Sequence, residues 1–233
     1  MKLETRTPPR RIFDLNPEPF KQEARRQFEQ WAESYDRSLL NHFLFRPAAE
    51  AFMEEIARWR LEHSHPLRVL DVGCGTGTLA GLLLRSGWPV EVVGLDYSPN
   101  MCRQAAVKAR AAGAAQRARF VTGDSEHLPF PDSRFDVITC SNSFHHYPHQ
   151  QAVVLGMRRL LAPGGRLMII DGFRDNVIGW VAFDVIIARV EKHVHHAPWT
   201  QMRDYFREAG FVNIRQRKIN FWMPLLVTTG DGT

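Results

Sequence analysis

The chain has 233 residues, of which 44% are hydrophobic and 24% are charged. These proportions are those of an ordinary globular protein, and the length suffices for one domain with a substantial core. The formal net charge of +5 is mild for this length and favours a solvated basic surface over attraction to nucleic acid or an anionic membrane. No apolar run reaches the roughly 20 residues of a membrane span, and none near the N-terminus resembles a signal peptide.

The three cysteines of the chain are Cys74, Cys102 and Cys140, and they show no C-x-x-C spacing. An odd number without that spacing argues against a disulfide framework and against a cysteine zinc site. We interpret all three as small packing residues. This usage fits the reducing cytosol, so a cytoplasmic location is expected.

The first 65 residues predict a tail followed by two helices. Residues 1–15 are polar and basic, and we expect them to form a mobile tail. Residues 16–65 follow as a helical lid, in which an apolar stripe that includes Trp31 and Tyr35 has helical spacing. A second helix is expected after Pro47, with its buried side formed by Phe52, Ile56 and Trp59.

Residues 66–171 alternate between short apolar runs and segments of helical periodicity. This alternation is typical of a parallel sheet with helices on its faces. Ser98 and Pro99 form a start signal for one of the helices, and Gly87 a stop signal for another. Strands are expected over 68–72, 90–95, 119–122, 135–140 and 166–171, and helices over 78–86, 99–113 and 150–161.

A glycine-rich turn follows the first of these strands. Gly73, Gly75 and Gly77 alternate with other residues, and leucines at helical spacing come next. Strand, tight turn and helix in this order open a nucleotide-binding α/β unit, where the helix N-terminus favours a negative group. The spacing is G-x-G-x-G and not the G-x-G-x-x-G of nicotinamide and flavin binders. Asp71 lies two residues before the first glycine, and Asp96 ends the second strand, where a carboxylate can accept hydrogen bonds from ribose hydroxyls.

Four stretches of the core together resemble the class I S-adenosylmethionine (SAM)-dependent methyltransferases. They are residues 69–79 with the glycine turn, 94–101 (GLDYSPNM), 123–131 (GDSEHLPFP) and 160–165 (LLAPGG). Their order and spacing are those of the family. The subgroup to which they are most similar is that of the methyltransferases of ubiquinone and menaquinone biosynthesis and their small-molecule relatives. The resemblance implies a doubly wound, Rossmann-like α/β sheet of seven mostly parallel strands, with an antiparallel last strand, and SAM as the cofactor.

The resemblance also assigns roles around SAM. Backbone N–H groups of the glycine turn suit the methionine carboxylate, and Asp71 can take the ammonium group. Asp96 is expected to accept from both ribose hydroxyls and Asp124 from the adenine amino group. Trp31 and Tyr35 fall in a stretch that closes over the cofactor in the subgroup, although packing on the domain stays open as their role. The expected cofactor-binding residues are Asp71, Gly73, Cys74, Gly75, Thr76, Gly77, Asp96, Tyr97, Met101, Asp124, Ser125, Ser141, Trp31 and Tyr35.

Beyond residue 171 the pattern changes. Residues 177–194 are almost all apolar with helical spacing, and we expect them to belong to a helical lid over 172–210 and to line the acceptor pocket. A core helix or a dimer face stays open as their role. Thr200 is expected to cap a short helix. The last two elements are strands that close the sheet as a hairpin, over 211–219 and 221–228 within a terminal segment of residues 211–233.

Histidines supply the candidates for a catalytic base. His145 and His146 follow the fourth strand, and His196 follows the apolar segment 177–194. A base is needed only when the acceptor loses a proton, and the first two imidazoles alternatively hold their own loop in place. Neighbouring histidines also raise the question of a metal ion. No metal is expected, because no carboxylate in the sequence evidently completes the ligand set.

The sequence therefore predicts a single methyltransferase domain over residues 16–233. Its acceptor is expected to be a small apolar or aromatic molecule, methylated on oxygen or carbon rather than nitrogen, and its assembly a monomer or homodimer. The turn after the fourth strand lacks the N/D-P-P-aromatic sequence of enzymes that methylate base amino groups, so no nucleic-acid partner is expected. The alternatives are a methyltransferase that acts on RNA or protein, and a SAM-binding protein without catalysis.

Overall fold

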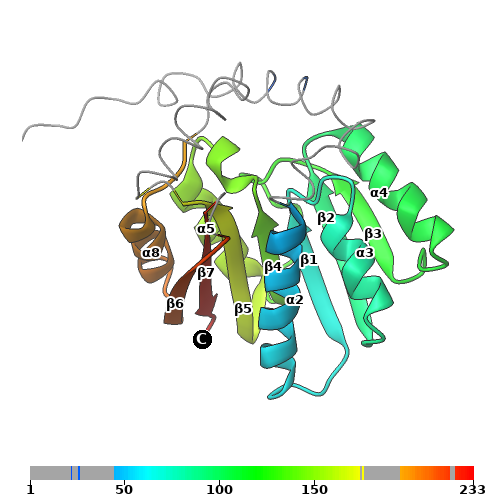
Figure 1. The fold of residues 1–233 in the computed structure, drawn as a ribbon, viewed down its shortest axis with the longest axis horizontal. Coiled ribbons are helices and arrows are strands. Elements are labelled where there is room, and N and C mark those ends of the chain that lie inside the picture. Colours follow the sequence, from blue (N-terminus) through cyan, green and yellow to red (C-terminus); the bar gives the residue numbers. More distant parts are fainter. Residues whose placement is uncertain (1–21, 23–25, 27–44, 174, 176–194, 221–223) are drawn as a thin grey trace, which may run out of the picture.

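The computed structural model in Figure 1 describes residues 22, 26, 45–173, 175, 195–220 and 224–233. The expected tail, the stretch with Trp31 and Tyr35, and the apolar segment 177–194 lie outside these residues. None of the helices in the described ranges combines the length and apolarity that a bilayer span requires.

The described residues form one sheet of seven strands with the order β3-β2-β1-β4-β5-β7-β6. All neighbouring pairs are parallel except the two that involve β7, which is antiparallel to both β5 and β6. This confirms the predicted fold class. The strands are β1 Leu67–Val72, β2 Val90–Asp96, β3 Ala118–Thr122, β4 Phe135–Ser141, β5 Leu161–Gly172, β6 Val212–Ile219 and β7 Leu225–Asp231.

Helices cover both faces of the sheet, as Figure 1 shows. Successive apolar residues of a strand point to opposite faces, so Val69 of β1 belongs to the core beneath α2 and α3, whereas Leu70 belongs to the core beneath α5 and α8. The helices are α2 Arg46–Arg60, α3 Thr78–Arg85, α4 Pro99–Ala111, α5 Gln150–Leu160 and α8 Trp199–Glu208, and a 3-10 turn, η4, spans Phe144–His146.

Several local predictions agree with the structure. Phe52, Ile56 and Trp59 form the buried side of α2. The Ser98 side chain accepts a hydrogen bond from the Met101 N–H and so caps α4. An orphan N–H at the start of a helix is one of the groups that must find a partner, and a serine hydroxyl supplies it here.

The predicted cap of α8 is wrong. The helix begins at Trp199, before Thr200, because Pro198 in an extended conformation precedes it. The Trp199 N–H donates instead to the Asp175 carboxylate at 2.8 Å. A side chain from a distant part of the sequence therefore satisfies this N–H group.

The strand β5 starts earlier than predicted. It begins at Leu161, where Leu161 pairs with Phe135 of β4, and a register shift separates this pair from the regular pairing that starts at Arg166. Regular pairing then brings Ser141 of β4 beside Ile170 of β5. The strand ends on which the function was predicted to depend thus lie along one edge of the sheet.

Candidate functional site

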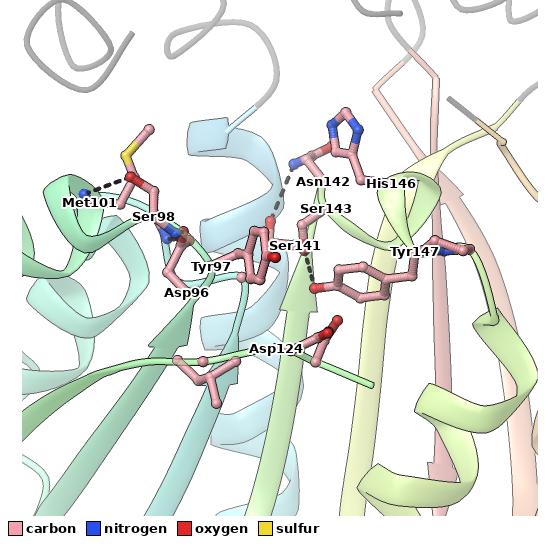
Figure 2. A pocket seen from close by; sticks show the side chains of 16 residues that line it. Asp96, Tyr97, Ser98, Met101, Asp124, Ser141, Asn142, Ser143, His146 and Tyr147 are labelled. Carbon is pink, nitrogen blue, oxygen red and sulfur yellow. Dashed lines mark hydrogen bonds between the residues drawn. The ribbon is translucent and has the colours of Figure 1, made fainter. Parts of the chain in front are cut away.

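A cavity of about 810 Å³, including its open mouth, lies at the carboxyl edge of the strands. Open parallel sheets bind their ligands at this edge. Figure 2 shows the side chains that surround it. The lining residues are Gly73, Gly75, Leu95, Asp96, Tyr97, Ser98, Met101, Gly123, Asp124, Ser125, Ser141, Asn142, Ser143, His146, Tyr147 and Pro148.

The glycine turn forms one wall through bare backbone. Gly73 has a φ of +73°, a conformation that L side chains rarely adopt, and a Cβ there would lie 2.2 Å from the Ser143 Oγ. Both the dihedral and the space therefore require glycine. Gly77, the third of the alternating glycines, precedes α3 as its N-cap and is not among the residues that line the cavity.

Asp96 is held at the cavity by backbone groups on both sides. Its Oδ2 accepts from the Gly75 N–H at 2.8 Å and its Oδ1 from the Ser98 N–H at 2.9 Å. Burial raises the pKa of Asp96, and these backbone hydrogen bonds work in the opposite direction. A carboxylate offers about four lone-pair sites, and the backbone N–H groups of Gly75, Ser98 and Tyr97 use at most three of them, so Asp96 keeps acceptor capacity for a ligand.

The predicted residues for the other end of an adenosine group also line the cavity. Tyr97 and Met101 follow β2, and Asp124 and Ser125 follow β3. The Asp124 Oδ1 accepts from the Glu126 N–H at 2.9 Å, which orients the carboxylate in its turn. Ser141, at the end of β4, faces the same cavity, as expected.

Asp71, Cys74 and Thr76 are buried behind this wall. None of them is among the residues that line the cavity. Asp71 Oδ1 accepts from the Thr139 hydroxyl at 2.8 Å. Burial raises the pKa of Asp71 to about 7, against the effect of Thr139 and with a further contribution from the charge of Asp96. The Asp71 carboxyl is therefore poised between its two protonation states near neutral pH.

Four residues after β4 line the cavity and were not predicted: Asn142, Ser143, Tyr147 and Pro148. The Ser143 Oγ and the Tyr147 hydroxyl lie 2.9 Å apart, directly against Gly73. Burial raises the pKa of Tyr147 well above its ordinary value, so its hydroxyl stays neutral. Their place directly after the fourth strand is the only sequence signal that pointed to them.

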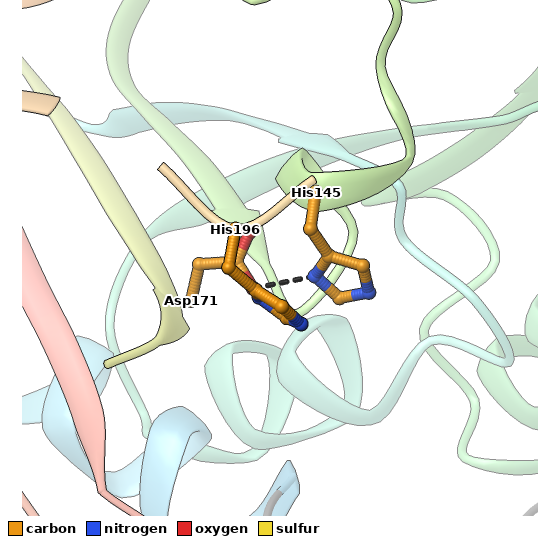
Figure 3. A group of neighbouring side chains, drawn as sticks. All are labelled: His145, Asp171 and His196. Atoms are coloured by element: carbon orange, nitrogen blue, oxygen red, sulfur yellow. Dashed lines mark hydrogen bonds and ion pairs between the residues drawn. The ribbon is translucent and has the colours of Figure 1, made fainter. Parts of the chain in front are cut away.

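Of the three predicted catalytic histidines, only His146 lines the cavity. His145 and His196 are buried side by side, with ring centroids 4.4 Å apart. Figure 3 shows both imidazoles at the carboxylate of Asp171, the residue near the end of β5. His145 Nδ1 lies 2.6 Å and His196 Nδ1 3.7 Å from Asp171 Oδ1.

This cluster corrects the sequence analysis on one point, because a carboxylate does accompany the two histidines. His145, Asp171 and His196 offer ligand atoms that all lie within 4.8 Å of one another. Asp171 was missed because it contacts His145 across 26 residues of sequence. The contact depends on β4 and β5 being neighbours, which places the residues that follow β4 beside the end of β5.

Burial alone raises the pKa of Asp171, but the charges and hydrogen bonds of His145 and His196 outweigh that effect and hold the pKa below its usual range. Asp171 is therefore ionised. A carboxylate is an acceptor only, so His145 Nδ1 must carry the hydrogen of their bond. The second ring nitrogen, Nε2, is then the basic atom of a neutral His145.

Comparisons with known proteins agree with this geometry. A family model described as a methyltransferase domain matches residues 69–165. The demethylmenaquinone methyltransferase of Deinococcus radiodurans is 38% identical over 151 residues, which cover 64% of this chain and 60% of that protein. The enzyme of the same name from Geobacillus kaustophilus is 28% identical over 217 residues, covering 84% and 91%.

Among solved structures, the magnesium protoporphyrin IX methyltransferase of Synechocystis with bound SAH superimposes with a TM-score of 0.72 at 20% identity, covering 92% of this chain and 100% of that one. At that identity the likeness shows the fold. The match spans 60–63% of the length of the first curated relatives.

Proposed function

We propose that the chain is a class I SAM-dependent methyltransferase and that it transfers a methyl group from SAM to a small apolar or aromatic acceptor. The observation that carries the proposal is Asp96, fixed by two backbone N–H groups at the mouth of a glycine-walled cavity. A carboxylate held in this way is preorganised to accept from the two hydroxyls of a ribose.

The other residues of the site fit the remaining parts of SAM. The glycine turn offers backbone N–H groups to the methionine carboxylate. Asp71 is buried beneath that turn and does not line the cavity, so it is proposed to act on the ammonium group through its charge. The positive group in turn favours the ionised form of this carboxyl, whose pKa burial raises to about 7. Tyr97 and Met101 enclose the adenine, and Asp124 accepts from its amino group. The roles of Trp31 and Tyr35 stay predictions, because those residues lie outside the described ranges.

SAM supplies an activated methyl group on a good leaving group, so the protein contributes positioning, exclusion of water and removal of a proton. His145 does not line the cavity, so we propose that it is the final proton acceptor and that the proton reaches it through His146. Asp171 accepts from Nδ1 of His145 at 2.6 Å, fixes its tautomer and stabilises the imidazolium that forms. His146, which lines the cavity, contacts the His145 ring at a centroid distance of 4.2 Å and is proposed to orient the acceptor.

The acceptor class we favour is a phenol or hydroquinone. Two similar proteins are named for methylation of demethylmenaquinone. Loss of a proton from an aromatic hydroxyl activates either that oxygen or the ring carbon beside it, so one base serves methylation on oxygen or carbon. The described residues that line the cavity include no lysine or arginine that could pair with an RNA phosphate backbone.

Binding of SAM is tested by calorimetry on the purified protein. We expect saturable binding of SAM and of S-adenosylhomocysteine, and a loss of about 100-fold in affinity for Asp96→Ala, because two charge-assisted hydrogen bonds disappear. Asp204→Ala removes an exposed carboxylate that pairs with Arg207 and is the matched control. Affinity that is equal in all three proteins would contradict the proposal.

Turnover is tested with labelled SAM and a panel of acceptors: a naphthohydroquinone, a catechol, a simple phenol, an amine, a carboxylic acid, a peptide and a transfer RNA. We expect transfer to the hydroxyl-bearing aromatics and a loss of about 10²- to 10⁴-fold in kcat for His145→Asn. Transfer to the peptide or the RNA would establish the alternative acceptor class. Tight SAM binding without turnover on any acceptor would instead favour a SAM-binding protein without catalysis.

A further inference from the structure

Asp171 is shared by two imidazoles that come from distant parts of the chain. His145 belongs to η4, whereas His196 precedes α8. Their Nδ1 atoms lie 2.6 Å and 3.7 Å from the same oxygen of Asp171, and Gly172 N–H donates to that oxygen at 2.8 Å. Figure 3 shows the two rings next to each other at the carboxylate. All three side chains are at most 7% exposed.

The main chain holds the two imidazoles together independently of their ring nitrogens. The His195 N–H donates to the His145 carbonyl at 2.8 Å. Gln150 Nε2 donates to the carbonyls of Phe144 and His195, at 3.1 Å and 2.8 Å. The backbone of His196 is therefore attached to η4 through its neighbour, and a change of the His196 side chain leaves this attachment in place.

We propose that His196 is a positioning residue for His145: its ring lies beside the Asp171 oxygen that accepts from His145, shares the charge of that carboxylate and so keeps His145 unprotonated and ready to accept a proton. This inference rests on the proposed function, because it assigns His145 the role of base. His196 itself does not line the cavity and is not assigned contact with the substrate.

The electrostatics support this division of labour. A carboxylate beside an imidazole favours the imidazolium form, so Asp171 alone would leave His145 protonated over a wider pH range. His196 also interacts with the negative charge of Asp171, which weakens the stabilisation that this charge gives to protonated His145. Any positive charge on the His196 ring also opposes a second positive charge on the His145 ring, whose centroid lies 4.4 Å away. Both effects favour neutral His145.

The other titratable groups that face Asp171 do not replace His196. Cys140 of β4 is buried, and burial raises the pKa of its thiol to about 12, so it is neutral. His146 of η4 contacts the ring of His145. Among the described residues His196 is therefore the side chain placed to compete for the carboxylate.

A divalent cation is the competing occupant of the cluster, since two histidines and one carboxylate form a set that zinc and iron accept. The hydrogen bonds within the cluster argue against it. Asp171 Oδ1 already accepts from His145 Nδ1 and from the Gly172 N–H. A cation bound through this oxygen and His145 Nδ1 would displace the proton that joins them, so we favour proton sharing and make the cation an outcome of the test.

The experiment is an NMR titration of the full chain labelled with 15N-histidine, which reads the tautomer and protonation of each ring without an acceptor. In the unchanged protein we expect His145 to carry its hydrogen on Nδ1. In His196→Phe, which keeps an aromatic ring but removes both nitrogens, the midpoint of the His145 titration should rise by about 0.5–1 pH unit. His196→Asn, whose amide can donate to Asp171, should restore at least half of the shift.

The control is His149→Phe, which removes an imidazole that is 46% exposed and pairs with Glu126, and it should leave the His145 titration unchanged.

With an active acceptor, the acidic limb of the pH profile of kcat should move with the NMR midpoint while KM for SAM stays constant. An unchanged His145 midpoint in both folded His196 variants would overturn the inference. So would stoichiometric binding of Zn²⁺ that removes the Nδ1 proton signal. A shifted midpoint in a protein without turnover would instead refute the proposed function.

Discussion

The strands β1 and β4 lie side by side, and a buried carboxyl lies at each end of this pair. The two carboxyls differ in the partners that surround them. At the amino edge, Asp136 accepts from the Arg68 backbone N–H at 2.8 Å and from its guanidinium at 3.0 Å and 2.6 Å. At the carboxyl edge, three residues along both strands, Asp71 accepts a hydrogen bond from the neutral Thr139 hydroxyl.

The consequences for the two carboxyls are opposite. Burial alone raises the pKa of Asp136, but the hydrogen bonds and charge of Arg68 outweigh it and leave the pKa below its ordinary value. Burial raises the pKa of Asp71 to about 7. The amino edge compensates its charge within the protein, whereas the carboxyl edge leaves a charge for a ligand to compensate. Asp136 at the amino edge therefore stabilises the fold, whereas Asp71 at the carboxyl edge is stabilised in its ionised form when a cationic ligand group binds nearby.

The largest expected effect comes from a side chain added to the cavity at the carboxyl edge. Gly73→Ala should lower SAM affinity by about 100-fold, because the added Cβ collides with Ser143 and moves the wall of the cavity. Gly87→Ala is the matched control: it has a similar φ of +77° but open space around its Cβ. The control should lose about 1 kcal/mol of stability and keep its SAM affinity. Calorimetry and thermal unfolding measure both quantities.

The second largest effect is expected when the ion pair at the amino edge is broken. Asp136→Asn should lower the free energy of unfolding by about 2 kcal/mol at pH 7, because Arg68 loses its charged partner. Asp132→Asn, which removes an exposed carboxylate that pairs with Arg159, should change it by less than about 0.5 kcal/mol. Because the pKa of Asp136 is lowered in the folded state, its contribution is present above the unfolded pKa and is lost as the pH falls through the folded one. Denaturant unfolding at pH 7 and pH 3 tests both the size and the sign.

Asp71→Asn should have the smaller and opposite effect on stability. The folded-state pKa is raised, so the wild-type protein loses stability as the pH rises from about 4 to about 7. The full shift sets a ceiling of about 4 kcal/mol, and local relaxation around the ionised group reduces it, so we expect the variant to be about 1–2 kcal/mol more stable at pH 8.

The same variant should bind SAM about tenfold more weakly, because the ammonium group loses its charged partner. Unfolding and binding measured on one preparation at pH 8 compare the two effects directly. A variant that is both less stable and equally able to bind SAM would remove the distinction between the two edges.

The sequence sufficed for the parts of the site that depend on local order. Asp96, Asp124 and Ser141 were placed at the cavity because each follows an apolar strand, and the ends of parallel strands meet at one edge. The antiparallel direction of the last strand and the buried side of α2 were likewise predictable.

Contacts between distant segments were beyond sequence reasoning. The pairing of His145 with Asp171 requires knowing that β4 and β5 are adjacent and in which register, and a single sequence gives no measure of either. The prediction of where α8 begins failed for the same reason. Asp175, which accepts from the Trp199 N–H, lies outside the local pattern from which Thr200 was predicted as the cap.

The position of β7 has a consequence for how the sheet assembles. This strand follows the other six in sequence, yet it lies inside the sheet, between β5 and β6. Until residues 225–231 are inserted, β5 has an open edge and β6 has no neighbour to join it to the sheet. The partly folded chain therefore presents two unprotected strand edges, at which a chaperone or another copy can bind.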